Sequence, residues 1–273
     1  MYEAKIVEDS VGPNVIRLTT MEVTLPRIVL AEFNTHRVFS RSSASSRAIP
    51  FAKMVARVLD APFVPEEWGT NQAGMQAGDS LSDERAELAR QAWMFARDAA
   101  VEHARVLNGL GVHKQIVNRL LEPFMWHTIL VTSTEWENFF GLRCHRDAQP
   151  QIQVAAKLMQ NALLQSQPKT LGYREWHLPM VTDADRSTMS VEDLRWVSAG
   201  RCARLSYLTH HGIRDAQADI ELALKLRASG HMSPFEHQAQ TLYEDNVSMY
   251  GNLRGWRQFR KSMNGEAVFK EDR

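Results

Sequence analysis

The spacing of apolar residues constrains this chain most, because it predicts several long helices and only a few strands. Residues 82–111 place apolar side chains three and four positions apart, which is the repeat of an amphipathic helix. Further helices are predicted over residues 113–122, 150–166, 190–207 and 215–229. Strands are predicted over residues 1–25, as a hairpin turning at Gly12-Pro13-Asn14, and over residues 239–250. Helices and strands do not alternate regularly, so the sequence predicts an α+β fold rather than a doubly wound parallel sheet.

The longest predicted helix is also the clearest helix in the sequence. Ser82 can cap its start, and Gly109 and Gly111 mark its end. The residues that recur at helical spacing are Leu88, Ala92, Phe95, Ala99, Val106 and Leu110. Pro123 is expected to end the next helix, and Gly230 to cap the last one.

Two segments lack the pattern of a helix or strand. Residues 35–47 follow a short helix predicted after Pro26 and are too rich in Ser and Arg for a core, so we expect a loop. Residues 60–80 hold Gly and Pro among polar residues and predict a mobile excursion rather than a linker between domains. We therefore expect a single domain over residues 1–273.

Composition excludes several classes of protein. The 32 Lys and Arg residues balance the 32 Asp and Glu residues, which argues against a protein that coats nucleic acid but allows a local site for one phosphate. No apolar run approaches the roughly 18 residues of a membrane span, and the first residues lack the apolar stretch of a signal peptide. Two cysteines cannot build a disulfide framework. We expect a cytoplasmic protein with neither a membrane nor a nucleic acid as direct partner.

The segment Thr35–Arg47 is the first candidate for chemistry. It holds three Arg, one His and five Ser within 13 residues. Guanidinium groups and hydroxyls bind phosphate through charge-assisted and bidentate hydrogen bonds. The alternative is a solvated basic loop whose Ser side chains make ordinary turns.

The segment Gly230–His237 is the second candidate. It places two His, one Ser and one Glu around a proline turn after a helix. A metal site would need His231, Glu236 and His237 together, and the spacing of a metalloprotease motif is absent. A His that caps the helix end is the simpler interpretation.

Two arginines, Arg119 and Arg143, form the third candidate. Each is flanked by apolar residues, and a half-buried Arg needs an anionic partner from ligand or protein. Internal salt bridges with Glu122, Glu135 or Glu137 are the alternative. Cys144 lies beside Arg143, but a lone Cys usually packs rather than attacks, and no hydrolase, Walker or Rossmann motif is present.

Taken together, these segments resemble the flavin-dependent thymidylate synthases over a little over half the chain. The family's Arg-His-Arg signature with spaced Ser, Ser and Arg is matched by Thr35-His36-Arg37, Ser40, Ser45 and Arg47. A second family block is matched by Ala203-Arg204-Leu205-Ser206-Tyr207 and by Gly230–His237. A third is matched by Arg119, Pro123, Asn138, Leu142-Arg143, Ala148-Gln149 and Ile152-Gln153.

The order of these blocks differs from the usual family order. The block ending in Pro-Phe-Glu-His normally precedes the Arg-His-Arg loop, whereas here it comes last. The chain therefore resembles a circularly permuted, phage-type member. Its tail, residues 252–261, resembles the helix that normally enters the loop, so this helix is expected twice, at 27–34 and at 252–261.

The resemblance implies a fold of long helices on a small antiparallel sheet, a homotetramer with shared active sites, and an enzyme that makes dTMP from dUMP. It implies FAD as cofactor, with NADPH and methylenetetrahydrofolate as co-substrates. Residues implied at the cofactor are His36, Arg37, Ser40, Asn138, Ser206, His231, Ser233 and Glu236. Residues implied at dUMP are Glu32, Ser45, Ser46, Arg47, Arg119, Arg143 and Gln258. Of these, Arg143 and Ser45 are expected to take part in the reaction, Arg143 by polarising the uracil ring.

Several positions depart from the family pattern. Thr35 replaces the first Arg of the signature, and Ser42 and Ser43 replace Asn and Glu. The Asp-Ser-His that follows Leu-Arg in the family is His145-Arg146-Asp147 here. Two alternatives therefore remain: a dUMP hydroxymethylase on the same scaffold, and a non-catalytic nucleotide-binding protein.

Overall fold

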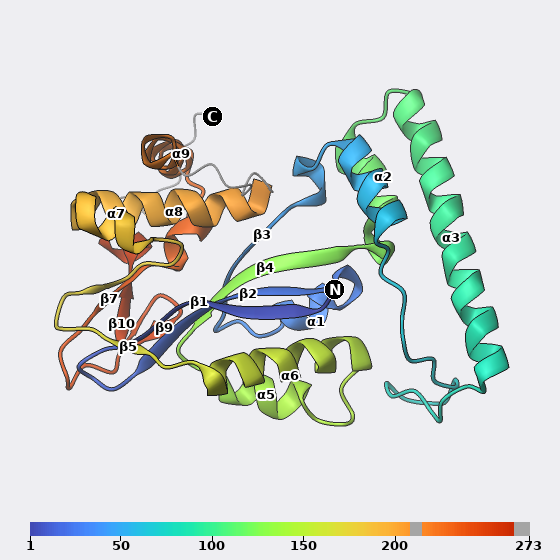
Figure 1. Ribbon diagram of the computed structural model, residues 1–273, viewed down its shortest axis with the longest axis horizontal. Coiled ribbons are helices and arrows are strands. Elements are labelled where there is room, and N and C mark those ends of the chain that lie inside the picture. The colour runs from blue at the N-terminus through green and yellow to red at the C-terminus, as the bar shows by residue number, and fades with distance from the viewer. Residues whose placement is uncertain (208–214, 265–273) are drawn as a thin grey trace.

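The computed structural model describes residues 1–207 and 215–264 and contains two five-stranded sheets surrounded by helices (Figure 1). The first sheet has the strand order β3-β4-β2-β1-β5. Its strands are β1 (Glu3–Val11), β2 (Arg17–Pro26), β3 (Ser40–Ser43), β4 (Trp126–Ser133) and β5 (Lys169–Thr170). The first four pair antiparallel, while β5 runs parallel to β1. The predicted α+β class is confirmed.

The hairpin β1–β2 turns at Gly12-Pro13-Asn14, as predicted. Its tip is tied to the C-terminal part of the chain. The Asn14 amide donates to the carbonyl oxygen of Gly255 at 2.6 Å, and the Trp256 indole donates to that of Ile16 at 3.1 Å. Two segments about as far apart as the sequence allows are therefore neighbours in space.

Strand β4 lies between β3 and β2 and is not among the strands predicted from the sequence. Its side chains alternate between the two faces of the sheet, as a strand requires. Ile129 and Val131 enter the core beneath α5 (Glu137–Arg143) and α6 (Pro150–Gln165), which cover one face (Figure 1). Leu130 packs on the other face against Cys202 and Leu205 of α8 (Val191–Tyr207).

The second sheet has the order β6-β7-β10-β8-β9. Its strands are β6 (Trp176–His177), β7 (Ala239–Thr241), β8 (Met249–Tyr250), β9 (Leu253–Arg254) and β10 (Trp256–Gln258). The strand predicted over 239–250 is therefore only partly right, because regular pairing holds at its two ends alone. The helix expected at 252–261 is wrong: β9, β10 and the 3-10 turn η5 (Phe259–Ser262) occupy it. Gly251 and Gly255 adopt φ values of 84° and 71°, which interrupt a right-handed helix.

Helix α3 (Asp83–Gly109) stands at one side of the molecule beside α2 (Phe51–Asp60) (Figure 1). The helix is confirmed, and much of its apolar stripe faces away from the core. Leu88, Phe95 and Leu110 are 60%, 71% and 74% exposed. The opposite side of the helix, with Val101 and Ala104, packs into the core.

The segment after α3 departs from the single helix predicted over 113–122. It forms α4 (Lys114–Val117) and then the 3-10 helix η3 (Asn118–Phe124), which contains Pro123. Pro123 therefore does not end the helical stretch. Residues 61–82 contain no helix, and Gly69 and Ser80 form an isolated bridge there.

Helices α7 (Asp183–Thr188) and α8 lie beside the second sheet, and α9 (Ala216–Ala228) packs on α8 (Figure 1). The predicted helices over 190–207 and 215–229 are confirmed, and Gly230 has the left-handed φ of 73° expected after α9. An ion-pair network joins the three helices. Arg201 contacts Asp185 at 2.5 Å and Asp219 at 3.0 Å, and Arg204 also donates to Asp219.

The helix predicted after Pro26 forms as η1 (Arg27–Val29) and α1 (Leu30–Asn34). The loop expected over 35–47 is partly wrong, because β3 lies within it and η2 (Ser46–Ala48) follows. In the part of the chain that the structure describes, no helix is long and apolar enough to cross a membrane.

Candidate functional site

The Ser- and Arg-rich segment runs along the edge of the first sheet. Strand β3 pairs with β4 alone, with Ser40 opposite Thr132 and Ser43 opposite Ile129. Ser40 and Ser42 are buried, and Arg41 and Ser43, which alternate with them, are half-buried. Because strand side chains alternate, two hydroxyls of this segment point toward one neighbour.

That neighbour is the C-terminal block predicted from sequence. His237, which follows η4 (Ser233–Glu236), contacts the Ser42 hydroxyl through Nε2 at 2.9 Å. Gln258 donates to the Ser40 hydroxyl at 2.7 Å and to the Glu236 carbonyl oxygen at 2.9 Å. The fold therefore brings Ser40, Glu236 and Gln258 together although the two blocks are about two hundred residues apart.

A second group of predicted residues surrounds His36. Arg143 donates from Nε to His36 Nε2 at 3.1 Å and from Nη2 to the Thr35 hydroxyl at 3.2 Å and the Glu32 carbonyl oxygen at 3.3 Å. The His36 ring meets the Phe139 ring edge-on, with centroids 4.9 Å apart. Burial, followed by the charges of Arg143 and Arg41, lowers the pKa of His36. The His36 imidazole is therefore neutral and accepts a hydrogen bond from Arg143.

The two arginines of the third block differ. Arg119 forms an ion pair with Glu122 at 2.8 Å, which Arg27 shares at 3.3 Å, so the internal salt bridge is confirmed for Arg119. For Arg143 the salt-bridge alternative is wrong, since its partners within residues 1–207 and 215–264 are a ring nitrogen, a hydroxyl and a carbonyl oxygen.

The segment Ser45–Arg47 has polar groups that are left open. Arg47 is exposed and makes no ion pair or side-chain hydrogen bond with the described residues. The Ser46 hydroxyl is buried and has no partner among the described residues. Asn118 holds the backbone of this turn, donating to the carbonyl oxygens of Ser46 at 2.7 Å and Ile49 at 3.0 Å. Buried polar atoms without partners are rare in folded proteins, so this turn is suited to a polar ligand.

The remaining predicted residues are more dispersed. Arg37, Asn138, His231 and Ser233 are exposed. Ser206 lies on α8, but its side chain falls outside the described part of the chain. His231 Nδ1 contacts the Ser229 hydroxyl at 2.9 Å, which agrees with a role at the end of α9.

The metal alternative does not fit these positions. His237 turns inward to Ser42 and Thr132, whereas His231 is exposed at the helix end. No group of three His, Cys, Asp or Glu side chains suited to a metal occurs within the described residues.

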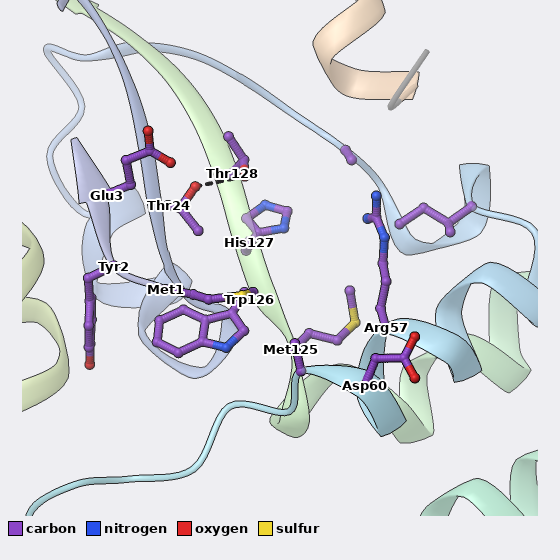
Figure 2. Close-up of a pocket in the computed structure, with 13 residues that line it drawn as sticks. Met1, Tyr2, Glu3, Thr24, Arg57, Asp60, Met125, Trp126, His127 and Thr128 are labelled. Atoms are coloured by element: carbon purple, nitrogen blue, oxygen red, sulfur yellow. Dashed lines mark hydrogen bonds between the residues drawn. The ribbon is translucent and has the colours of Figure 1, made fainter. Parts of the chain in front are cut away.

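A cavity of about 520 Å³ opens beside the Ser45–Arg47 turn (Figure 2). Ala44 and Ile49, which bracket the turn, line it together with Arg57 of α2 and Trp126 and His127 of β4. Burial, with a smaller contribution from the charge of Arg27, lowers the pKa of His127 to about 3. None of the predicted site residues lines this cavity. Arg57 belongs to no motif, and the sequence shows only that it lies on the helix after the Ser- and Arg-rich segment.

Neither cysteine is set up as a nucleophile. Burial raises the pKa of the Cys202 thiol to about 12 and also raises that of Cys144. The thiolate, which is the reactive form, is therefore disfavoured at both positions. The arginines on either side of Cys144 in sequence do not offset its burial.

Comparison with known proteins identifies the family. Residues 17–169 match the family model Thy1, described as thymidylate synthase complementing protein. The chain belongs to the Thy1 family. These are the flavin-dependent thymidylate synthases, as the sequence motifs predicted. The Thy1 match includes β3, Arg119 and Arg143 and stops before His231–His237.

Two solved structures are similar to this Thy1 protein. Both are the UMP/dUMP methylase PolB from Streptomyces cacaoi, one bound with 5-Br UMP and the other with 5-Br dUMP. They share 15% and 17% identity, each with a TM-score of 0.48 over 60% of this chain and 88% or 90% of the other. No curated protein sequence matches.

Proposed function

We propose that this Thy1 protein is an enzyme that transfers a one-carbon unit to C5 of dUMP and makes dTMP. The observation that carries the proposal is the family match over residues 17–169, which contains the Ser- and Arg-rich segment and both arginines of the third block. Methylenetetrahydrofolate is the proposed carbon donor, and NADPH the proposed hydride donor.

The open polar groups fit a small nucleotide. A phosphate dianion needs hydroxyls and a guanidinium that no protein anion neutralises. Ser45, Ser46 and Arg47 supply both, and Arg47 has no ion pair within the described residues. Arg143 uses Nε and Nη2 internally, so its Nη1 remains to polarise a uracil carbonyl as negative charge develops on the ring.

The residues proposed to hold FAD lie on both sides of β3. His36, Arg37 and Ser40 come from the first block, and Asn138 from α5. The C-terminal side would contribute Ser206, His231, Ser233 and Glu236. Bound FAD would supply the redox chemistry, which suits a chain whose two thiols are unreactive. Thr35 stands where the family has an arginine, and its hydroxyl instead fixes Arg143.

The proposed site calls for more than one copy of the chain. Within one copy, the Arg119 pair and the Arg143 group have no partner in common. Helix α3 exposes a stripe of large apolar side chains that monomeric proteins seldom leave in water. We propose a homotetramer with shared sites, in which this stripe is covered.

We also propose that the chain is circularly permuted. Contact between His237 and Ser42, 195 residues apart, supports this proposal, because packing of the two blocks does not depend on their order in the chain.

Tritium release from [5-³H]dUMP with FAD, NADPH and methylenetetrahydrofolate tests the proposal. Release with a product of dTMP mass is the expected result. A product heavier by one oxygen would identify the hydroxymethylase instead. A purified protein that stays colourless after FAD is added and releases no tritium would refute both enzymes and leave a nucleotide-binding protein.

A further inference from the structure

Six buried polar side chains form a continuous hydrogen-bonded chain across the first sheet, which we call the polar seam. It begins at Ser42 and ends at Ser10. Its members in order are Ser42, His237, Thr132, Thr20, His177 and Ser10. The five distances between them are 2.9, 2.9, 2.7, 2.8 and 2.9 Å.

The strand register explains why two histidines are needed. The hydroxyls come from β3, β4, β2 and β1, in the order of the sheet. Thr20 and Thr132 are directly opposite each other, and their hydroxyls form a direct hydrogen bond. On β3, Ser40 is opposite Thr132, and Ser42 lies two residues farther along. On β1, Glu8 is opposite Thr20, and Ser10 lies two residues farther along. Each imidazole, contributed by the C-terminal half, spans one of these offsets.

The protons of the polar seam can be counted. Burial lowers the pKa of both His177 and His237 to about 3, so both rings are neutral near pH 7. A neutral ring has one N–H and one lone pair, and each hydroxyl has one proton. The four hydroxyls and two rings therefore hold one proton more than the five bonds use.

The polar seam is best satisfied when its hydrogen bonds all point the same way. No member makes another side-chain hydrogen bond within the described residues. A neutral ring must donate through one nitrogen and accept through the other, and a Thr hydroxyl that accepted from both neighbours would leave its own buried proton without an acceptor. Thr20 and Thr132 are both 0% exposed, so the surplus proton is better placed on one of the two terminal hydroxyls. Ser10 is 0% exposed and has no other acceptor in the described part of the chain, whereas Ser42 is 5% exposed at the edge strand. An unsatisfied donor is costly where no water or ligand can reach it, so the surplus proton belongs on Ser42.

We propose that Ser42 is a hydrogen-bond donor to the ligand bound beside β3, and that His237 and His177 act as positioning residues that direct its proton outward. The acceptor is a carbonyl or phosphate oxygen of the flavin or nucleotide. The identity of the ligand rests on the proposed function, whereas the direction of the hydrogen bonds in the polar seam does not. It places a binding role on a residue that departs from the family pattern.

Solid-state NMR of the full-length protein with ¹⁵N-labelled histidine rings tests the direction. A seam that points toward Ser42 requires the proton on Nε2 in both His177 and His237. H177Q and H237Q assign the two signals by their disappearance. A proton on Nδ1 in either ring would place the surplus proton on a group other than Ser42 and overturn the proposal.

Binding of FAD and dUMP to S42A tests the donor. Loss of one neutral hydrogen bond predicts roughly three- to tenfold weaker binding of one of these ligands. S43A is the matched control, because Ser43 lies on the same strand with its side chain on the opposite face. Equal affinities for wild type, S42A and S43A would overturn the proposal.

A pair of substitutions at His237 separates positioning from simple packing. The Gln of H237Q keeps one donor and one acceptor, whereas the Leu of H237L keeps neither. We expect H237Q to retain most of the ligand affinity and H237L to lose as much as S42A; equal loss in both would argue for packing alone. If wild type binds neither FAD nor dUMP, the proposed function fails, while the NMR result still decides the direction of the seam.

Discussion

Arg143 donates a hydrogen bond from Nε to Nε2 of His36 across 3.1 Å and so joins α5 to the turn before β3. The bond requires a lone pair on His36 Nε2, which an imidazolium lacks. A fixed cation and a neutral ring are thus held together where the sequence analysis placed the flavin and the uracil.

Replacing Arg143 should therefore change His36. R143A removes a positive charge that helps to lower the pKa of His36, so this pKa should rise toward 6.5, although burial, the larger cause, remains. NMR titration of the His36 ring measures it. R143K is the control that keeps the charge and should leave the pKa low. A lower His36 pKa in R143A would contradict this account. Tritium release should fall in both R143A and R143K.

Arg47 should matter for ligand binding and hardly for folding. Its side chain is exposed and has no ion pair within residues 1–207 and 215–264, so R47A should change the free energy of unfolding by less than about 0.5 kcal/mol. Calorimetry should show loss of dUMP binding, while flavin absorbance stays. K53A, at an exposed position on α2, should bind dUMP normally. Release of flavin by R47A would show that this turn holds the cofactor instead.

The exposed stripe of α3 should control assembly. Phe95 is 71% exposed at its middle, and F95E would place a charge in any interface that covers it. Light scattering coupled to gel filtration should show a smaller assembly than wild type. E87Q, which changes a polar residue elsewhere on the helix, should not alter the mass. A wild-type protein that is monomeric would contradict the shared site.

Acid should destabilise the fold through its buried histidines. His127, His177 and His237 have pKa values of about 3, below the 6.5 of an unfolded chain. Between these two pKa values the unfolded state binds more protons than the folded state. Well below pH 6.5, each ring therefore lowers the free energy of unfolding by about 1.4 kcal/mol for every unit by which the pH falls. Burial raises the pKa of Glu8 from 4.5 to about 7, so between these pH values this carboxyl makes the fold more stable as the pH falls. Its effect offsets that of roughly one histidine.

Urea unfolding at pH 7, 6 and 5 measures this dependence. H103Q, which changes an exposed ring, should leave the slope with pH unaltered. Stability that does not fall between pH 6 and pH 5 would show that the three rings are not neutral in the folded protein.

Asp219 should be the most sensitive position of the α7–α8–α9 network. It is 1% exposed and accepts hydrogen bonds from both Arg201 and Arg204. D219A leaves Arg201 with one buried partner fewer and should cost about 3–5 kcal/mol of unfolding free energy. E221Q, two residues along α9 and exposed, should cost little. A loss below about 1 kcal/mol for D219A would mean that Asp185 alone satisfies Arg201.

Local patterns in the sequence predicted elements better than they predicted burial. Helices α3, α6, α8 and α9 and the first hairpin follow from apolar spacing and from turn residues such as Gly230. The same spacing on α3 cannot say whether an apolar face meets the core of its own chain or another surface, and there Leu88, Phe95 and Leu110 are exposed.

Longer-range contacts explain the elements that the sequence did not reveal. Strand β3 is a strand because β4 pairs with it, although Ser and Arg are not strand formers. The helix-like tail became β9 and β10 because β7 offers a pairing edge and two glycines turn the chain. In the candidate site, the motifs identified Ser40, Glu236 and Gln258, but not the hydrogen bonds that join them to His237 and Ser42.

The bond between the amide of Asn14 and the carbonyl oxygen of Gly255 has a consequence for the rate of folding. It joins residues 241 positions apart, and the Trp256 indole reaches the same hairpin from 240 positions away. Such a ring can close only after most of the chain has been made, and closing it loses much chain entropy before any contact compensates. The contact between the hairpin tip and the last strands is therefore expected to form late and to slow refolding.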